Sequence, residues 1–411
     1  MSIESAAKDL ATELVRHEQV EIICHHDADG IAAGAIMSIA LYRARIPFRL
    51  RTVSRLQAET LPSGRETLLC DLGSGIADLP EETMVIDHHL PVFSGPNHVN
   101  PRLSGIDGDT SLSGAGAAYL VANAIGDNRD LAGLVLTGII GDGQQLIGKN
   151  HEIFLEGIGN GIITAKRGIR LPGRDLTEQL VFATSPYLPG ITGEEEEVAS
   201  LISRCSGRDE KPAPDLLISS LVIGSAGFCR ADALRNLYGD TYQLEREVIE
   251  DAATMTMLID ACGKEGQGSI AAALCLRSSR EIATGWEVAR SHRIRLVGEL
   301  KRILASPSES GVYEIHDPRL ASDIADTITG CMDRNPAPVI VYAREEDGSC
   351  HLSVRIPHPL MAETQSGLGT LVQSLAAECG GSGGGHTTRA GAWIAGDHLD
   401  RFITGINGAF A

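Results

Sequence analysis

Short apolar runs rich in β-branched residues alternate with segments of helical periodicity in the first third of the chain. The runs predict strands that each close on polar residues, at 20–24, 48–53, 67–73 and 83–89. The helical spacing of apolar positions predicts helices at 4–17, 31–42, 112–126 and 131–141. This alternation is typical of a doubly wound α/β fold with a parallel sheet, in which ligands bind beyond the carboxyl ends of the strands.

The pattern changes twice along the rest of the chain. The middle is less regular, with Pro, Gly and charged residues between helical segments, one of which we expect over 241–262. Strand-like runs then return in "GVYEIH", "PVIVYAR" and "CHLSVRI", and a helix is expected over "LGTLVQSLAAECG". We therefore predict an N-terminal α/β domain over 1–190, a mainly helical connecting or inserted region over 191–305, and a smaller C-terminal α/β domain over 306–411.

Composition narrows the class of protein. The chain has 411 residues, of which 43% are hydrophobic, and its formal net charge is −19. This negative charge argues against a protein that binds nucleic acid non-specifically over its whole surface, because such binding depends on Lys and Arg side chains. A local basic channel can still be present on a protein that is acidic as a whole. The nine cysteines include no CxxC pair, and the most apolar segments are too short to span a bilayer. We expect a soluble, cytoplasmic protein with free thiols and no membrane association.

Acidic residues and histidines gather where four apolar runs end, in "HHDADG" (25–30), "CDLG" (70–73), "DHH" (87–89) and "GDG" (141–143). If the runs are neighbouring strands and a helix end, eight side chains converge in one crevice: Asp27, Asp29, Asp71, Asp87, Asp142, His25, His88 and His89. Divalent cations would keep such crowded carboxylates ionised. Carboxylate and imidazole ligands without thiolates favour Mn²⁺ or Mg²⁺ over zinc. Their number suffices for two ions roughly 3.5–4 Å apart.

Each of these segments also has a plainer interpretation. A single Asp–His pair at a strand end is more often a turn or a helix cap, and a DG dipeptide is mostly a turn signal. The occurrence of all four segments, in order and at the ends of apolar runs, favours the metal site.

The same four segments resemble motifs I to IV of the DHH phosphoesterase superfamily. That superfamily includes RecJ exonucleases, nanoRNases, cyclic-dinucleotide phosphodiesterases and one class of inorganic pyrophosphatases. The C-terminal "GSGGGH" (381–386), preceded by "SVRI", resembles the substrate-binding DHH-associated domain. The resemblance implies a DHH catalytic domain over 1–190 and a DHH-associated domain over 306–411. The form "HHDADG" and the segment "SPYLPGITG" resemble the archaeal RecJ-like, GINS-associated nuclease type most.

This resemblance implies a set of ligands divided between two metal ions, with Mn²⁺ expected and Mg²⁺ as the alternative. One ion would be bound by His25 and Asp27, and the other by Asp29. Asp71 would bridge the two ions, and the set would be completed by two further residues, His88 and Asp142.

The resemblance also implies two catalytic residues in the "DHH" segment. Asp87 would orient the imidazole of His88, as metal-bound imidazoles usually require. His89 would face the scissile phosphate rather than a metal ion. Water held between the ions would attack phosphorus in line, without a covalent intermediate.

Substrate binding is expected from the C-terminal domain, through Arg355, Gly383, Gly384, Gly385 and His386. Successive glycines expose backbone N–H groups that can cradle an anion. A flexible turn is the alternative for the glycines, and a surface charge is the alternative for Arg355. Two basic clusters could also guide a single strand, in "AKRGIRLPGR" and in "RSSREIATGWEVARSHRIRLVGELKR". For the second cluster a solvated helix face is the stronger alternative.

These implications favour a metal-dependent phosphodiesterase that hydrolyses single-stranded DNA or RNA as a RecJ-like exonuclease. One alternative is a nanoRNase or cyclic-dinucleotide phosphodiesterase acting on very short substrates, which the acidic body and sparse aromatic residues favour. A further alternative is a replication-complex scaffold, against which the retained ligand positions weigh. Expected partners are a single-stranded nucleic acid or short oligonucleotide, and GINS-type replication proteins.

Overall fold

The computed structural model describes residues 2–56, 61, 64–206, 212–332, 337–357, 360 and 367–410. The chain forms two compact units. The first unit consists of Met1–Arg167 and Asp240–Arg290, and the second of Gly168–Gly239 and Ser291–Ala411. The three-part division into 1–190, 191–305 and 306–411 stays a prediction.

Five parallel strands form the sheet of the first unit, in the order β2-β1-β3-β4-β5. This is one of the common orders of open α/β sheets. The strands are β1 (Val20–His25), β2 (Phe48–Val53), β3 (Thr67–Cys70), β4 (Met84–Ile86) and β5 (His98–Val99). The predicted α/β class with a parallel sheet is confirmed, because all four predicted apolar runs form neighbouring strands.

The two faces of this sheet are covered differently. Side chains alternate between the faces along each strand, so Ile22 and Leu68 join the large core formed with the helices. Ile23, Leu69 and Val85 point to the other face, where the described side chains packed on them come from β2 and from the connections between strands. Connections therefore cover the second face where a helix would otherwise lie.

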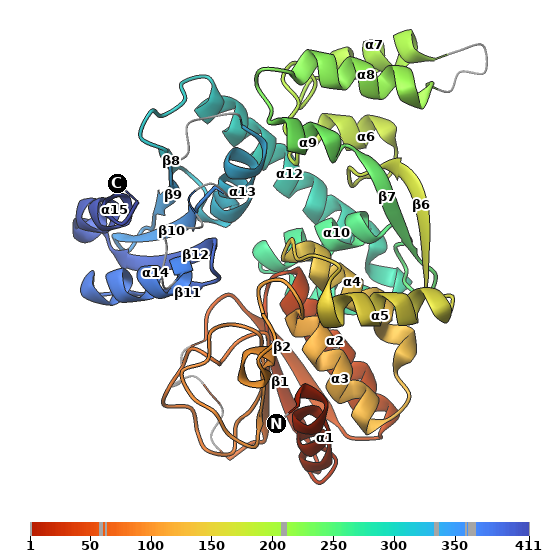
Figure 1. The fold of residues 1–411 in the computed structure, drawn as a ribbon, viewed down its shortest axis with the longest axis vertical. Coiled ribbons are helices and arrows are strands. Elements are labelled where there is room, and N and C mark those ends of the chain that lie inside the picture. Colours follow the sequence, from red (N-terminus) through yellow and green to blue (C-terminus); the bar gives the residue numbers. More distant parts are fainter. Residues whose placement is uncertain are drawn as a thin grey trace. The chain divides into compact units, whose positions relative to one another are not determined.

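Helices of the first unit pack mainly on the face that carries the large core, and α2 and α3 lie side by side (Figure 1). They are α1 (Ile3–Leu14), α2 (Ala28–Arg43), α3 (Gly114–Ile125), α4 (Ala132–Gly141), α5 (Gly148–Gly159), α10 (Ala252–Lys264) and α11 (Gly268–Cys275). The chain passes between the units in α12 (Ile282–Leu304) and in the paired strands β6 (Ile163–Ile169) and β7 (Tyr238–Leu244).

One predicted element is wrong at its start. The helix expected over 241–262 begins only at Ala252, because residues Tyr238–Leu244 form β7. Only Gly239 and Leu244 of "YGDTYQL" are buried, and its two tyrosines and threonine favour a strand over a helix.

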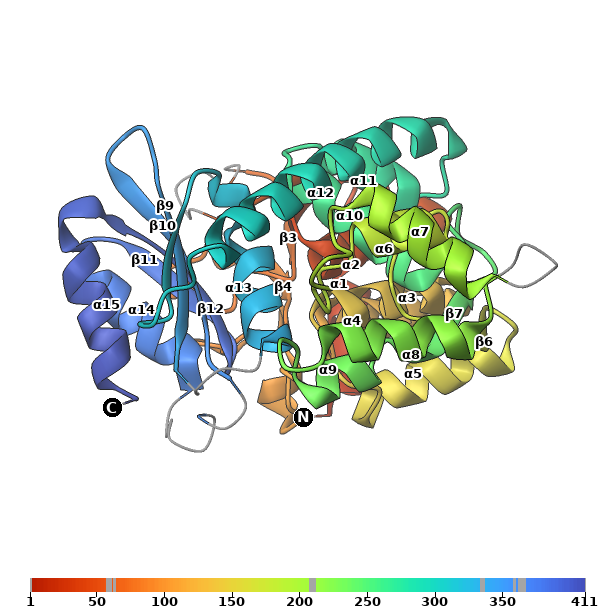
Figure 2. The same cartoon turned by 90° about the horizontal axis from the view of Figure 1, so that it is seen from above.

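The second unit contains a mixed sheet in the order β11-β12-β10-β9-β8, in which only β8 and β9 are parallel. Figure 2 shows α13 on one face of this sheet and α14 with α15 on the other. The strands are β8 (Val312–Ile315), β9 (Val339–Arg344), β10 (Ser349–Arg355), β11 (Ser382–Gly385) and β12 (Arg389–Ala395). The helices are α6 (Leu176–Val181), α7 (Glu195–Cys205), α8 (Pro214–Ser225), α9 (Ala231–Arg235), α13 (Ala321–Cys331), α14 (Gly367–Glu378) and α15 (Leu399–Gly408).

Candidate metal centre

The carboxyl ends of three neighbouring strands deliver acids and histidines to one edge of the sheet in the first unit. His25 is the last residue of β1, and Asp71 and Asp87 directly follow β3 and β4. Asp27 caps the helix that follows β1, since its Oδ1 accepts a hydrogen bond of 3.0 Å from the backbone N–H of Gly30. The side chains therefore converge because parallel strands end at the same edge of a sheet.

His25, Asp27 and Asp71 form a first cluster. His25 Nδ1 lies 2.7 Å from Asp27 Oδ2 and 3.7 Å from Asp71 Oδ2. One ligand atom from each of the three residues lies within 4.8 Å of the others, which is close enough for all three to contact one ion.

A second cluster consists of Asp29, His88 and Asp142, whose ligand atoms also lie within 4.8 Å of one another. His88 Nε2 is 3.6 Å from Asp29 Oδ2 and 3.3 Å from Asp142 Oδ2. The same nitrogen lies 3.1 Å from Asp71 Oδ1. Asp71 thus has one oxygen beside each cluster, and the structure brings together all six residues expected as ligands.

Asp71 is the most unusual group of the site. Its side chain is 1% exposed, and neither of its buried oxygens has a regular hydrogen bond to a described residue. Burial, followed by the negative charges of Asp27 and Asp29, holds the pKa of Asp71 well above its usual value. A buried carboxylate with oxygens directed at two groups of potential ligands fits a shared divalent cation, whose charge would keep it ionised.

Asp29 has a structural role as well as a place in the second cluster. It is fully buried in the first turn of α2, and its two oxygens accept hydrogen bonds from the backbone of Gly114 (2.6 Å) and Ala115 (2.9 Å). These N–H groups begin α3, so the carboxylate meets donors that the helix itself cannot satisfy. Burial raises the pKa of Asp29. The plainer interpretation as a cap therefore holds together with the metal-ligand hypothesis.

Two glycines make room for these carboxylates. A Cβ at Gly138 in α4 would lie 2.1 Å from Asp29 Oδ1, and one at Gly114 would lie 2.8 Å from Asp71 Oδ1. Both distances are shorter than real Cβ contacts, so no larger residue fits without displacing an acid. Neither glycine was predicted from the sequence, because only the packing of α3 and α4 against α2 reveals their role.

The "DHH" segment corrects one expectation. Asp87 Oδ1 accepts hydrogen bonds from the backbone of His88 and from the ring of His89, whose Nδ1 lies 2.7 Å away. The ring of His88 is held instead by the carbonyl oxygen of Gly108, 2.6 Å from its Nδ1. The expectation that Asp87 orients the ring of His88 is therefore wrong. The reason is the turn after β4, which brings the second histidine ring back onto the acid.

The hydrogen-bonded acid of this segment is strongly ionised. Although burial opposes it, the His89 ring, His88 and the backbone N–H of Ser74 hold the pKa of Asp87 below its usual range. Asp87 thus orients the loop backbone and the His89 ring.

Further polar residues support the histidines and were not predicted. Arg102 Nε donates to the carbonyl oxygen of His88 (2.9 Å), and Asn100 Nδ2 donates to that of His89 (2.9 Å). Gln144 Nε2 donates to the Gly108 carbonyl that holds the His88 ring (2.9 Å). Only Gln144 had a signal in the sequence, its position two residues after Asp142.

The residues expected to bind substrate lie in the second unit. Arg355 is 7% exposed on β10, and its guanidinium donates to both oxygens of Asp326, at 2.7 and 3.3 Å. The alternative that Arg355 is a surface charge is therefore wrong. Its role in binding substrate stays a prediction.

The glycine-rich segment is a hairpin strand, β11, rather than a loop. A Cβ at Gly383 would lie 2.8 Å from the carbonyl oxygen of Gly391, and one at Gly385 would lie 2.3 Å from that of Arg389. Close strand packing thus explains these two glycines without a ligand. Gly384 has open space around it, and His386 follows the strand. Substrate binding by these residues stays a prediction.

Comparisons with known proteins agree with this fold. Residues 312–411 match the DHHA1 domain family. RecJ from Thermus thermophilus, in complex with Mn²⁺, has a similar structure, with a TM-score of 0.60 and 19% identity. The match covers 99% of this chain and 54% of that RecJ, so the chain spans about half its length.

The C-terminal residues thus match the DHHA1 domain family, and the chain has a fold similar to that of RecJ over 99% of its length. The fold also resembles that of Cdc45 from Entamoeba histolytica, with a TM-score of 0.61 and 14% identity over 99% of each chain. An uncharacterized protein of Methanocaldococcus jannaschii is 27% identical over 429 residues, which cover 98% of this chain and 96% of the relative.

Six of the eleven basic side chains in the two basic clusters form ion pairs with acids. Arg277 contacts Asp130 and Glu247. Further ion pairs join Arg167 to Asp240, Arg174 to Glu178, Arg295 to Asp317, Lys301 to Glu194 and Arg302 to Glu299. Guiding a nucleic-acid strand with these side chains would require phosphates to displace carboxylates.

No helix in the described part of the chain is both long and apolar enough to cross a membrane.

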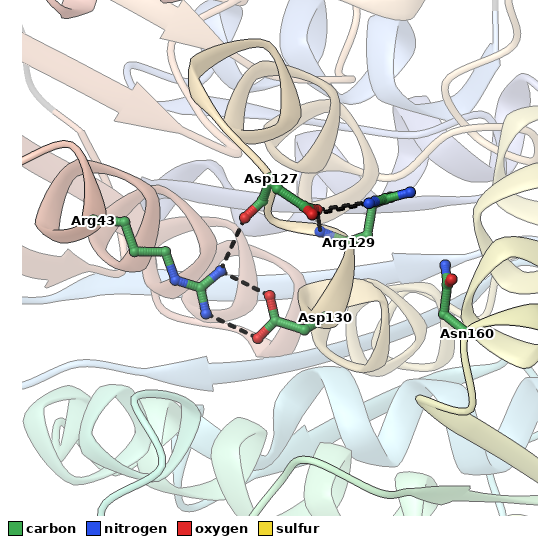
Figure 3. A pocket seen from close by; sticks show the side chains of 5 residues that line it. All are labelled: Arg43, Asp127, Arg129, Asp130 and Asn160. Carbon is green, nitrogen blue, oxygen red and sulfur yellow. Dashed lines mark hydrogen bonds and ion pairs between the residues drawn. The ribbon is translucent and has the colours of Figure 1, made fainter.

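A pocket of ≈ 370 Å³ in the first unit is lined by Arg43, Asp127, Arg129, Asp130 and Asn160 (Figure 3). Figure 3 shows the Arg43 guanidinium paired with the Asp130 carboxylate, at 2.7 and 2.9 Å, and Arg129 paired with Asp127. Each of the four charged side chains that line this pocket is thus paired with a side chain of opposite charge. None of the predicted site residues lines it, so it is not the candidate metal centre.

Proposed function

We propose that this protein is a metal-dependent phosphodiesterase that hydrolyses single-stranded nucleic acid as an exonuclease. The observation that carries the proposal is Asp71, a buried carboxylate with one oxygen beside each of two acid–histidine clusters. Such a shared carboxylate is the arrangement expected between two metal ions in phosphoester hydrolysis.

In this proposal the two clusters divide the ligands. His25 and Asp27 would hold one ion, and His88, Asp29 and Asp142 the other, with Asp71 shared. Bound Mn²⁺ or Mg²⁺ would offset the carboxylate charges and make water reactive towards phosphorus. The chain itself fixes the ligand geometry through the helix cap at Asp27, the backbone donors at Asp29 and the Gly108 carbonyl at His88.

His89 would stabilise the developing charge on the phosphoryl oxygens. Asp87 accepts a hydrogen bond from Nδ1 of His89, which directs Nε2 of the ring away from Asp87. When Nε2 carries a proton, it would donate to a phosphoryl oxygen of the substrate.

The first experiment offers the purified protein end-labelled single strands of graded length, as DNA and as RNA, with Mn²⁺. Stepwise shortening of long strands is the expected result. Cleavage confined to dinucleotides or cyclic dinucleotides would establish the alternative of a phosphodiesterase for very short substrates. The ion pairs across the basic clusters are the observation that favours that alternative.

A second experiment tests whether the metal centre is the source of activity. Asp71→Asn should lower hydrolysis by roughly a thousandfold or more, because it removes the shared charge. Asp9→Asn changes an exposed acid on α1 and should leave hydrolysis unchanged. Equal activity in both variants would contradict the proposal.

A replication-complex scaffold is the second candidate, supported by the similarity in fold to Cdc45 over 99% of both chains. The assembled clusters weigh against a purely structural role. GINS-type replication proteins stay a predicted partner. A pull-down of these proteins with the Asp71→Asn variant would test whether partner binding persists when the proposed hydrolysis is lost.

A further inference from the structure

Two buried cysteines of the second unit lie closer together than ordinary packing allows. Cys229 Sγ is 3.1 Å from Cys331 Sγ, and both residues are free thiols. Carbon atoms pack best at roughly 3.5–4.0 Å, and sulfur is larger than carbon. The two sulfur atoms are therefore closer than a non-bonded contact favours, and a disulfide bond between them would replace this close contact.

The backbone segments that carry these thiols lie side by side. Cys229 forms an antiparallel bridge with Met332, the residue after Cys331, and the N–H of Arg230 donates to the carbonyl oxygen of Cys331 at 2.8 Å. Paired strands lie about 4.7–4.9 Å apart, so the bridge holds the two cysteines on neighbouring segments. Because the S–S bond of a disulfide is about 2.05 Å long, the two sulfur atoms need to approach each other by only about 1 Å.

A third group orients both thiols. The carbonyl oxygen of Tyr187 lies 3.1 Å from Cys229 Sγ and 3.5 Å from Cys331 Sγ. One acceptor thus holds both sulfur atoms on the same side of the site. By comparison Cys205, which belongs to the same core, lies beside Ser220 Oγ at 3.9 Å.

We propose that Cys229 and Cys331 are a site of reversible oxidation and form an intramolecular disulfide with a small disulfide such as glutathione disulfide as oxidant. The Cys229 thiolate attacks the oxidant and releases one thiol, which leaves a mixed disulfide. The Cys331 thiolate then attacks the sulfur of Cys229 and releases the second thiol. The two cysteines lose two electrons and two protons, and the oxidant gains them as two thiols.

Such a bond would close a loop of about a hundred residues, because the two cysteines are 102 positions apart. Cross-links over long loops lower the conformational entropy of the unfolded chain. The bond would connect the segment before α9 to the last residue of α13, both within the second unit. Oxidation should therefore stabilise this unit against unfolding.

The test oxidises the reduced full-length protein with glutathione disulfide, unfolds it in denaturant that contains N-ethylmaleimide to block every remaining thiol, and maps peptides by mass spectrometry. We expect a cross-linked peptide pair containing Cys229 and Cys331, and its loss after reduction. Because the thiols are 4% and 1% exposed, the bond should form slowly. The oxidised protein should melt roughly 5–10 °C higher than the reduced protein.

Two matched variants complete the test. Cys331→Ser should abolish both the cross-link and the rise in melting temperature, whereas Cys205→Ser should leave both intact. Independent blocking of both thiols by N-ethylmaleimide in oxidised wild-type protein, or cross-links to other cysteines instead, would overturn the proposal. The peptide map of the wild type decides this even if Cys331→Ser fails to fold.

Discussion

At the scale of single residues, the site depends on side chains placed where few alternatives fit. Asp71 has a backbone φ of 61°, in the left-handed region that only Gly, Asn and Asp adopt with moderate frequency. Its N–H is held by the carbonyl oxygen of Ile86 on the next strand, at 2.8 Å. Asn is therefore the conservative replacement at this position, whereas Ala would add backbone strain to the loss of charge.

Gly138 offers a test of how closely the acids are packed. Gly138→Ala should lower hydrolysis and Mn²⁺ affinity by about tenfold or more, because the new Cβ would displace the Asp29 carboxylate. Isothermal titration with Mn²⁺ and activity assays measure the two effects. The matched control is Gly159→Ala at the end of α5, where a Cβ meets open space. Similar Mn²⁺ affinities in both variants would contradict this account of Gly138.

His351 should make the stability of the second unit depend on pH. It stacks on Trp393 with ring centroids 4.6 Å apart, and burial lowers the pKa of His351 to about 4. The unfolded chain takes up this proton near pH 6.5, so the folded state loses stability as pH falls from 6.5 towards 4. The loss should be about 2 kcal/mol between pH 7.5 and 5.

Urea unfolding at the two pH values measures this change. His351→Phe keeps an aromatic ring against Trp393 and cannot take up a proton, so its stability should fall less over the same interval. An identical pH dependence in wild type and variant would show that His351 is not the responsible group.

At the scale of elements, one helix or strand end serves several tasks. The start of α2 contributes acids to both clusters, since the N-cap residue Asp27 belongs to the first cluster and Asp29, in the first turn, belongs to the second. In the second unit, α13 carries Asp326 against Arg355 on β10. Arg389 Nε on β12 lies 3.5 Å from the same carboxylate. One acid thus orients two guanidinium groups from neighbouring strands.

If Arg355 binds a substrate phosphate as predicted, Asp326→Asn should raise KM by about tenfold and change kcat little, because it releases the guanidinium without touching the metal centre. Steady-state kinetics on a short oligonucleotide separate the two constants. Asp400→Asn, at an exposed acid on α15, is the control. A loss confined to kcat would place Asp326 outside substrate binding.

Elements also show what the sequence could and could not reveal. Runs such as "VEIIC" and "TLLC" form buried strands because they are short and largely apolar. Because the strands are parallel, the acids that follow them gather at one edge of the sheet. β7 was missed because its partner, β6, lies about 70 residues away along the chain. Asn100 and Arg102 were missed for the same reason, since their contacts to the histidine backbone exist only after the sheet has folded.

At the scale of the whole molecule, metal binding should control the stability of the first unit. Saturating Mn²⁺ should raise its melting temperature by roughly 5–10 °C over metal-free protein, because the ions bind only the folded site. Asp71→Asn should lose this rise. Without metal the variant should melt higher than the wild type, since a buried repulsive charge has been removed.

Differential scanning calorimetry with and without Mn²⁺ measures both expected changes in melting temperature, the rise caused by Mn²⁺ in the wild type and the rise caused by Asp71→Asn in metal-free protein. Asp9→Asn again serves as the control and should match the wild type in both conditions. A metal-free Asp71→Asn protein that melts well below the wild type would instead mark Asp71 as a structural residue.

The structural role of the Asp29 carboxylate limits which substitutions this position can accept during evolution. Because it closes the start of α3, its removal would unpair two backbone donors in the protein interior as well as disturb the second cluster. A descendant without the proposed phosphodiesterase activity would therefore still be selected to keep a side-chain oxygen at this position. Asn has one side-chain oxygen and would accept only one of the two hydrogen bonds. Among the predicted metal ligands, Asp29 should therefore be one of the last to be replaced.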